Sequence, residues 1–408
     1  MISLEEARAV VLEQCLPLTP KLVPIEHALG NVTAAGITST EAVPPFANTA
    51  VDGFAVRAAE TAAPPVALDV VGTIAAGSPP QPAVGPGQAV RIPTGAPMPP
   101  GADAVVMVED TDAWQQPPAS SVTVNKPVQA GDNVRPAGDD IAPAQLVFPS
   151  GTTLTAAHIG VLASIGVQDV LVLPRARVGV LSTGDELVDG PGPLGPGQIR
   201  ESNRRTLLAL VSQVNAEPVD LGLARDTEEE IGAALSAGLA RCDVILTSGG
   251  VSVGDFDYVK VVLDWMSGGS MSWMQVAIKP AKPFAFGVVD GTPVFGLPGN
   301  PVSSMVSFEC FARPALRQMM GHASIHRARV TAVADGPLRR RPDGRVHLVR
   351  VRADCSPVDG RFHVSSTGGQ ASHMLHATAL ANALAVLPDG DGLDMGDDVE
   401  VLLLGWPE

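Results

Sequence analysis

The residues best suited to chemistry gather between Asp243 and Lys260, in the run D-V-I-L-T-S-G-G-V-S-V-G-D-F-D-Y-V-K. The apolar, β-branched start of this run is typical of a strand that is covered on both faces. The paired glycines that follow can turn backbone N–H groups toward an anion, and the serine hydroxyls are further donors. Two carboxylates two positions apart then favour a hard divalent cation. The alternative is a tight turn with an aspartate cap. The residues of the predicted phosphate-binding loop are Ser248, Gly249, Gly250, Ser252, Gly254, Asp255 and Asp257.

Polar and charged residues of similar types also follow other expected strands. A segment rich in hydroxyls and acids, S-T-G-D-E-L, spans 182–187, and Asp226 lies shortly after another strand. Lys279 and Lys282 form a pair three positions apart, and a glycine loop that leads into a helix spans 296–304. Because the carboxyl ends of parallel strands meet at one edge of a sheet, we expect one shared pocket. Its carboxylates, lysines and open backbone amides fit a metal-bound phosphate ester.

Polar residues outside this group each allow two interpretations. Asp52 stands before a glycine in an irregular, proline-rich segment, where it is a turn residue or part of a site. Thr94 presents a hydroxyl on a rigid loop after a strand. Arg350 and Arg352 are expected on one face of a strand by the period of two, where they receive an anion or face solvent.

Charge and hydropathy limit the class of function. The chain has 408 residues and a net charge of −16, with a pI near 4.9. This negative charge argues against a protein whose main role is to bind nucleic acid or an anionic membrane. A local lysine cluster can still bind a small anion. No apolar run approaches the ~20 residues of a membrane span, and acids stand near the N-terminus where a signal peptide would be basic. We therefore expect a cytoplasmic protein with no nucleic-acid or membrane partner.

Cysteine and histidine spacing gives no sign of a zinc site or a disulfide framework. The four cysteines are far apart in the sequence, and the histidines show no H-E-x-x-H pattern. Reduced structural thiols are the expectation.

Apolar periodicity divides the chain into segments of different type. Short β-branched runs with Gly and Pro between them predict a small all-β module, whereas strands that alternate with helices from 177 to 320 are typical of a mostly parallel three-layer α/β domain. Short strands return after 326 and predict a β-barrel-like domain. The expected helices are 3–16, 156–165, 203–214, 227–240, 256–267 and 301–319. The expected strands of the two β regions are 66–75, 88–92, 104–108, 121–127 and 145–148, and then 328–333, 346–352, 362–366, 384–387 and 398–404.

The predicted fold is therefore multidomain, with α/β and β parts. A three-layer α/β domain is combined with a small all-β module, a linking α+β domain and a C-terminal β-barrel-like domain. The predicted bounds are 1–42 with 141–174 for the linking domain, 43–140 for the all-β module, 175–325 for the α/β domain and 326–408 for the C-terminal domain.

Seven motifs, in the same order, resemble those of the molybdopterin molybdenumtransferases, the MoeA family that includes the gephyrin E domain. They are A-V-D-G-F-A (50–55), P-T-G-A-P (93–97), G-D-D-I (138–141), S-T-G-D-E-L (182–187), S-G-G-V-S-V-G-D-F-D-Y (248–258), K-P-A-K-P-F-A-F-G (279–287) and G-L-P-G-N-P-V-S (296–303). The resemblance covers essentially the whole chain. It implies insertion of molybdate into adenylated molybdopterin with release of AMP and with Mg²⁺ as helper, the last step of molybdenum cofactor biosynthesis.

The resemblance also implies a role for each of the site residues. An elongated homodimer would place the cleft between the α/β domain of one subunit and the all-β module of the other, which contributes Asp52 and Thr94. Mg²⁺ would lie near Glu186 and Asp257, and transient contact with the adenylyltransferase of the same pathway is expected. Asp226 would lie on the same metal and phosphate side, and Lys279 and Lys282 would neutralise phosphate or molybdate. The substrate-binding positions implied are Ser248, Gly249, Gly250, Ser252, Gly254, Pro298, Gly299, Asn300, Pro301, Arg350 and Ser372.

Three positions depart from the family pattern. Ala281 stands where Gly is usual, and Phe54 replaces a frequent Tyr. Gln275 stands where some members have a basic residue, which changes the positive charge expected around molybdate.

Two other functions compete with this interpretation. The single α/β domain of molybdopterin adenylyltransferase resembles 175–320, but it leaves 43–140 and 326–408 unexplained, and both carry family motifs. A non-catalytic scaffold of the gephyrin type is the second alternative, and no long linker or partner-binding tail supports it.

Overall fold

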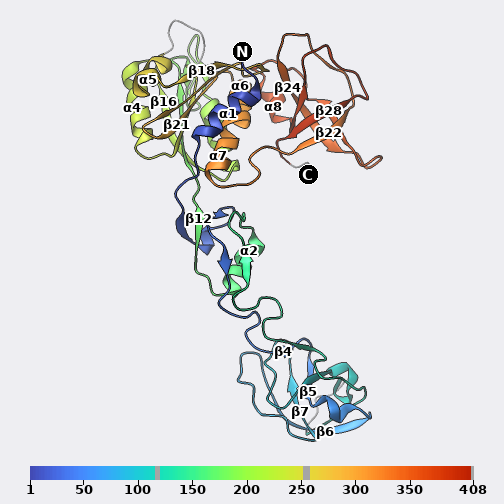
Figure 1. Cartoon of the computed structure of the whole chain (residues 1–408). Coiled ribbons are helices and arrows are strands. Elements are labelled where there is room, and N and C mark those ends of the chain that lie inside the picture. The colour runs from blue at the N-terminus through green and yellow to red at the C-terminus, as the bar shows by residue number, and fades with distance from the viewer. Residues whose placement is uncertain (115–119, 251–257, 406–408) are drawn as a thin grey trace. The chain divides into compact units, whose positions relative to one another are not determined.

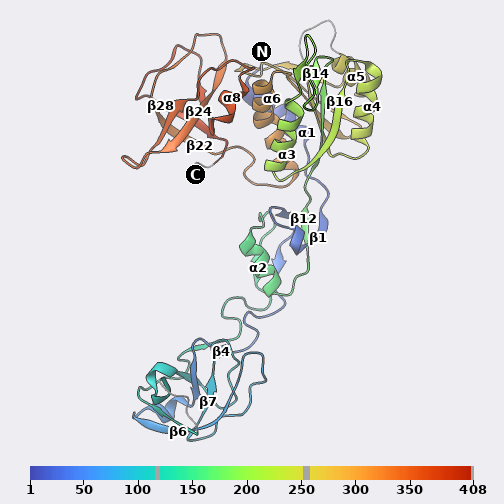
Figure 2. The same ribbon diagram turned by 180° about the vertical axis from the view of Figure 1, so that it is seen from behind.

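The computed structural model describes residues 1–114, 120–250 and 258–405, and it divides the chain into two compact units. Unit 1 comprises residues 1–21, 30–34 and 171–408, and unit 2 comprises 22–29 and 35–170. Figures 1 and 2 show the elements of each unit from opposite sides. No helix in the described ranges is long and apolar enough to cross a membrane.

Unit 1 contains a six-stranded sheet with the order β16-β13-β17-β21-β20-β18. The first four strands in this order run parallel, whereas β20 pairs antiparallel with both neighbours. The mostly parallel sheet expected from the alternation of strands and helices is confirmed, with an antiparallel edge. The strand bounds are β13 Arg177–Thr183, β16 Glu217–Ala224, β17 Val244–Ser248, β18 Ser272–Gln275, β20 Pro283–Val289 and β21 Thr292–Leu297.

Helices cover both faces of this sheet, because successive side chains of its central strands point to opposite sides. In β17, Val244 and Leu246 pack into one core, and Ile245 packs into the other. The first core includes residues of α1, α3, α6 and α7, and the second includes residues of α4 and α5. The three-layer prediction is therefore confirmed. The helix bounds are α1 Leu4–Gln14, α3 Asn203–Gln213, α4 Glu228–Leu239, α5 Tyr258–Met266, α6 Pro301–Ser307 and α7 Arg313–Met319.

Capping residues set the start of several helices. At α1, the Ser3 side chain accepts from the backbone of Glu6, whose carboxylate accepts in return from Ser3, which forms a capping box. Thr227 caps α4 in the same sense through the backbone of Glu230. The predicted helix 301–319 is divided, because a π-helical turn at Phe308–Ala312 separates α6 from α7.

The C-terminal strands of unit 1 form a closed barrel. Each of five strands pairs with two others in the ring β24-β25-β22-β28-β26, and the β24–β26 pairing closes it. Small and branched side chains such as Val351, Val364 and Val401 fill the barrel interior. The predicted β-barrel-like domain is confirmed. Its strands are β22 Arg329–Ala334, β24 Val346–Cys355, β25 Phe362–Ser366, β26 Ala383–Leu387 and β28 Asp398–Leu403, and the additional elements are β19 Ile278–Lys279, β23 Leu338–Arg339, β27 Gly392–Leu393 and α8 Leu375–Ala379.

Unit 2 contains a five-stranded sheet with the order β8-β5-β7-β6-β9, and this sheet is the predicted all-β module. Phe54 and Val106, on neighbouring strands, are fully buried in its core. Val43 and Ile141 form an antiparallel bridge, so the chain enters and leaves this module at adjacent points. The strands are β5 Gly53–Val56, β6 Val66–Thr73, β7 Gln88–Ile92, β8 Ala104–Met107 and β9 Ser121–Val124.

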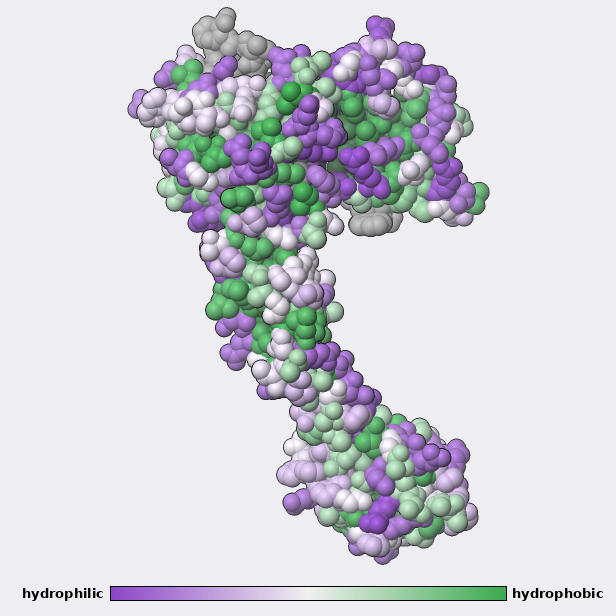
Figure 3. Space-filling view, viewed as in Figure 1, coloured by the Kyte–Doolittle hydropathy of each residue, from purple (hydrophilic) through white to green (hydrophobic). Residues whose placement is uncertain are grey.

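The remaining elements around 21–49 and 134–173 are short. The predicted strand 145–148 exists as β11, but it pairs with β3 and lies outside the five-stranded sheet. The other elements are β1 Lys21–Pro24, β2 Val32–Thr33, β3 Ile37–Thr38, β4 Asn48–Thr49, β10 Val134–Arg135, β11 Leu146–Phe148, β12 Asp169–Leu173 and α2 Ala156–Ser164, with β14 Leu187–Val188 and β15 Ile199–Arg200 in unit 1. Figure 3 shows hydrophobic residues among hydrophilic ones on the surface near α2 and β12.

Candidate active site

Unit 1 has a cavity of about 660 Å³ at the carboxyl ends of its parallel strands, called the carboxylate cavity below. Residues from eight separate stretches of the chain line it, as expected when parallel strands end at one edge. The predicted site residues that it contains are Glu186, Asp226, Ser248, Gly249, Gly250, Pro298, Gly299, Asn300 and Pro301.

Two acidic segments meet at one end of this cavity. The backbone N–H of Asp185 donates to Asp226 Oδ2 at 3.4 Å, and that of Asp226 donates to Asp185 Oδ1 at 3.3 Å. Burial raises the pKa of Asp226, and the charges of Asp185 and Glu186 raise it further. The Glu186 carboxylate occupies the space beside Gly184, where a Cβ would lie 2.6 Å from Oε2. Negative charge is therefore concentrated here, which favours a cation.

Asn203, at the start of α3, joins two of the predicted loops. Its Nδ2 donates to Ser248 Oγ at 2.9 Å and to the Gly299 carbonyl at 2.7 Å. Because Ser248 Oγ accepts from Asn203, its own hydrogen is free to be donated to a ligand in the cavity. Glu201 also lines the cavity, and it accepts from Ser182 Oγ and from the backbone of Arg204.

Glu201 and Asn203 were not predicted as site residues from the sequence. They stand in the segment E-S-N, which has no glycine and no repeated acid to mark it. The available signal was a polar segment with serine before asparagine at the start of an expected helix.

One expected donor in the glycine loop is used elsewhere. The N–H of Gly249, predicted to face an anion, donates instead to the Leu297 carbonyl at 3.1 Å. Gly249 contributes through its backbone shape, because its φ is +103° and a Cβ would lie 2.9 Å from the Thr183 carbonyl oxygen. Ser252, Gly254, Asp255 and Asp257 lie outside the described residues.

A second cavity of about 880 Å³, called the basic cavity below, adjoins the first. Pro283 lines both cavities, and the consecutive residues Ser372 and His373 line one cavity each. The Ser372 carbonyl accepts from the N–H of Val302 at 3.1 Å, so this segment also holds the first turn of α6. Lys279 and Lys282 line the basic cavity, so the single pocket expected from the sequence is divided into two.

Positive charge dominates the lining of the basic cavity. Its ionisable residues are Lys279, Lys282, Arg339, Arg340, Arg341, Arg345, His347 and one carboxylate, Asp343. In the described part of the chain, Lys279, Lys282 and Arg341 form no ion pair, whereas the other arginines do. A cavity with several unpaired cations is suited to an anion.

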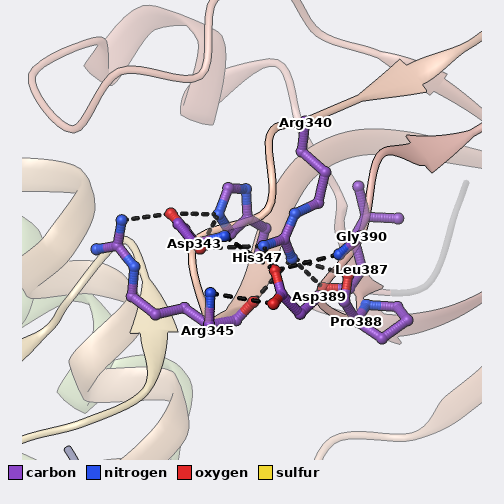
Figure 4. Close-up of polar contacts among 9 residues, drawn as sticks. Arg340, Asp343, Arg345, His347, Leu387, Pro388, Asp389 and Gly390 are labelled. Atoms are coloured by element: carbon purple, nitrogen blue, oxygen red, sulfur yellow. Dashed lines mark hydrogen bonds and ion pairs between the residues drawn. The ribbon is translucent and has the colours of Figure 1, made fainter.

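A polar network holds one wall of this cavity, as Figure 4 shows. Asp343 accepts hydrogen bonds from Arg340 Nη2 at 3.0 Å and from Arg345. The bond from Arg345, followed by that with His347, holds the pKa of Asp343 well below its ordinary value. Asp343 also lies 3.1 Å from His347 Nε2. Arg340 is fixed by three backbone carbonyls and by Asp389 at 2.6 Å. The wall is therefore rigidly hydrogen-bonded.

The environment of Arg350 differs from that expected for an exposed arginine on a strand face. It is fully buried, and its Nη2 donates to the carbonyls of Gly369 at 2.8 Å and Ala371 at 3.3 Å. It is not among the residues that line the basic cavity, although the segment that it supports leads to Ser372. Arg352 is exposed and paired with Asp354.

Asp52 and Thr94 lie together in unit 2. Asp52 Oδ1 accepts from the Thr94 N–H at 2.7 Å and from its hydroxyl at 2.8 Å, and these bonds lower the pKa of Asp52. The carboxylate is therefore ionised and fixed in orientation.

The three departures from the family pattern have different structural settings. Ala281 has a φ of +74°, which a glycine adopts without steric cost. Phe54 is fully buried. Gln275 ends β18 and, within the described ranges, is not a lining residue of either cavity.

Comparison with known proteins identifies the family. The chain is 36% identical to a molybdopterin molybdenumtransferase of Haemophilus influenzae over 98% of both chains. The chain belongs to the MoeA family. It is also 39% identical to molybdopterin molybdenumtransferase 2 of Mycobacterium tuberculosis, over 95% of this chain and 96% of that protein.

Family models and solved structures agree with this assignment to the MoeA family. The model of the MoeA N-terminal region (domain I and II) matches residues 2–166, that of a probable molybdopterin binding domain matches 179–318, and that of the MoeA C-terminal region (domain IV) matches 332–404. Two structures of MoeA proteins from Pyrococcus horikoshii, 31% and 27% identical, have TM-scores of 0.80 and 0.79. They cover 100% and 99% of this chain, and this chain covers 100% of each. The multidomain fold is thus that of MoeA proteins, and both cavities are lined mainly by residues of the second and third matched regions.

Proposed function

We propose that this chain inserts molybdate into molybdopterin that is supplied as its adenylate, with release of AMP and with Mg²⁺ as helper. The observation that carries the proposal is the pair of adjoining cavities in unit 1. One combines carboxylates, hydroxyls and glycine loops, and the other is rich in unpaired cations. An organic phosphate and a separate tetrahedral oxyanion, held side by side, need two such environments. The names of the full-length relatives, molybdopterin molybdenumtransferases, support the same reaction.

The chain's own groups would hold the organic substrate in the carboxylate cavity. Ser248 donates its hydroxyl hydrogen, and Asn203 fixes that hydroxyl and the Gly299 loop together. Such positioning favours a reactive geometry, since a shift of about 1 Å can change a rate by about 100-fold.

The residues present fit a magnesium ion bound with substrate phosphate. The described residues contain no group of three His, Cys, Asp or Glu side chains that could hold a metal by themselves. Mg²⁺ commonly binds through one or two carboxylates together with phosphate oxygens and water, and the crowded charges at Glu186 and Asp226 match that pattern. Glu186 and Asp226 would hold the ion, and Asp257 is a third ligand implied by resemblance. When bound, the ion would supply charge stabilisation at the phosphoanhydride.

The basic cavity would hold molybdate. Lys279, Lys282 and Arg341 would neutralise its charge, and Ser372 would add a polar contact next to the carboxylate cavity. The ion-paired arginines shape the wall, so their charges are largely compensated.

We also propose that the active protein is a homodimer in which a second copy supplies Asp52 and Thr94. Three leucines of unit 2, Leu22, Leu29 and Leu146, expose 69%, 51% and 57% of their surface, and contact with a second copy would bury this apolar area. The cytoplasmic location and transient contact with the adenylyltransferase stay predictions.

The decisive assay gives the purified protein adenylated molybdopterin, Mg²⁺ and molybdate. Molybdate-dependent AMP release supports the proposed transferase. Synthesis of the adenylate from ATP would instead indicate an adenylyltransferase, and binding without turnover would indicate a scaffold. Glu186→Gln should lose turnover, and Glu217→Gln, which makes the same change at the opposite end of the sheet, should retain it.

Mixing two inactive variants tests the shared site. Asp52→Asn and Glu186→Gln should each be inactive, whereas subunit exchange between them should restore about a quarter of wild-type activity, since half of the dimers would be mixed with one intact site each. Absence of any recovery despite proven exchange would contradict a site built from two copies.

A further inference from the structure

His347 stands beside Lys279 in the wall of the basic cavity. In the parallel pairing of β19 with β24, Lys279 lies opposite His347, so both side chains lie on the same face of the sheet. Both residues line the basic cavity. An oxyanion bound to Lys279 would therefore lie close to the imidazole ring of His347.

The contacts of Asp343 determine which ring nitrogen of His347 carries hydrogen. The Asp343 carboxylate accepts hydrogen bonds from Arg340 and Arg345, and an ionised carboxylate can only accept. His347 Nε2, at 3.1 Å from Asp343 Oδ2, must therefore be the protonated nitrogen. Figure 4 shows Asp343 beside the His347 ring.

The other ring nitrogen, Nδ1, is available to a ligand. It has no hydrogen-bond partner among the described residues, and it is not one of the enclosed polar atoms that lack a partner. In the neutral ring, Nδ1 presents a lone pair, which repels an oxyanion that has no hydrogen of its own. In the imidazolium, Nδ1–H is a donor to the same oxyanion.

We propose that His347 couples oxyanion binding in the basic cavity to uptake of a proton, with Asp343 holding the ring in place. The inference rests on the proposed function, because it concerns the molybdate side of that site. The imidazolium donates from Nδ1 to a molybdate oxygen, and the proton is released again when the oxyanion leaves.

The groups that face His347 support this coupling. Burial lowers its pKa, Arg340 and Lys279 lower it further, and Asp343 opposes them, so the ring of the empty cavity is neutral at neutral pH. Arg345 lies behind Asp343, and the neighbour on β26 is the apolar Leu387. A dianion next to Lys279 offsets the positive charges and raises the pKa of His347. Affinity for the dianion therefore falls as the pH rises above the pKa of the free protein.

The same geometry separates two kinds of oxyanion. Molybdate and sulfate have no hydrogen at pH 7.5, so they need the imidazolium. Hydrogenphosphate carries its own hydrogen and can donate it to the lone pair of the neutral ring, so its binding takes up no proton at His347.

Isothermal titration calorimetry with inorganic molybdate, in two pH 7.5 buffers of different ionisation enthalpy, tests the proposal. Wild type should take up about 1 proton per molybdate, and His347→Gln should take up almost none and bind more weakly. His363→Gln is the matched control, since His363 also contacts aspartates but does not line the cavity. It should behave as wild type.

The outcomes separate this inference from the proposed function. Molybdate binding without proton uptake, or equal uptake in His347→Gln, overturns the role of His347 and leaves molybdate binding intact. No molybdate binding by wild type overturns both. An NMR titration of the His347 ring gives an independent check, because its pKa must rise when molybdate is added; an unchanged pKa overturns the coupling.

Discussion

The role of Gly249 depends on its backbone angle and on the lack of space for a side chain. Its φ of +103° is unfavourable for any side chain, and a Cβ would lie 2.9 Å from the backbone oxygen of Thr183. Gly299 lies beside it in the lining of the carboxylate cavity, where a Cβ would meet only the Gly249 Cα, at 3.7 Å. A side chain is therefore unfavourable at position 249, whereas a methyl group fits at position 299.

Gly249→Ala should therefore destabilise unit 1 by about 2–4 kcal/mol, through the left-handed backbone and the clash. Gly299→Ala should change stability by less than about 1 kcal/mol. Urea unfolding followed by circular dichroism measures both. Equal losses in the two variants would show that the close approach of Gly249 to Thr183 does not matter.

Asp226 gives a second prediction at this scale. Its pKa is raised in the folded state, so the folded protein binds this proton more tightly than the unfolded chain, and stability is lost as the pH rises through the folded pKa. At pH 7, Asp226→Asn should raise the melting temperature by about 1–2 °C while it removes Mg²⁺-dependent turnover. Below the ordinary pKa of an aspartate, the difference in melting temperature should vanish. A lower melting temperature for the variant at pH 7 would contradict the crowding of charge.

Residue types in motifs predicted much of the site, but hydrogen bonding changed some roles. Gly249 was predicted as an N–H donor to an anion, yet its N–H is used by Leu297. Arg350 was predicted as an anion contact, yet it is buried against carbonyls. Neither outcome can be obtained from spacing, because both depend on which carbonyls the folded chain brings near.

Helix α3 shows how an element organises the site. Asn203, in its first turn, donates to both Ser248 Oγ and the Gly299 carbonyl, so the helix start fixes two loops that are far apart in sequence. The periodicity of apolar residues predicted this helix at 203–214, close to its observed bounds of Asn203–Gln213. The contact of its first residue could not be predicted, since it depends on the packing of α3 against the sheet.

Asn203→Ala should lower kcat/KM by at least about 10-fold, because both loops lose a fixed position. The loss of two hydrogen bonds should also cost about 1–3 kcal/mol of stability. Ser212→Ala is the control on the same helix, where the hydroxyl donates only to Leu208 of α3 itself. Steady-state kinetics and thermal unfolding measure the two effects. Full activity in Asn203→Ala would exclude this positioning role.

At the scale of the whole molecule, the all-β module is joined to the chain at a narrow point. Val43 and Ile141 are bridged, and the five-stranded sheet lies wholly between them. An all-β module was predicted here from β-branched runs between glycines and prolines, and its bounds of 43–140 stay a prediction. By contrast, the division of the site into two cavities could not be predicted, because it depends on how the barrel packs beside the α/β sheet.

A fragment of residues 43–140 should fold by itself, since its sheet and its core residues such as Phe54 and Val106 are all internal. Dispersed amide signals in an NMR spectrum and a cooperative thermal transition are expected. The same fragment with Val106→Asp should be unfolded. A disordered wild-type fragment would contradict the predicted module bounds.

The closed ring of the C-terminal barrel has an evolutionary consequence. Every strand in it has a neighbour on each side, and the part of β24 that lines the basic cavity lies between β26 and β19, so this wall cannot gain another strand. New preferences for one oxyanion over another must then arise by exchange of individual side chains on that wall. Natural variation in ion selectivity should accordingly be found as point differences at positions such as 339–349, with the backbone of the ring preserved.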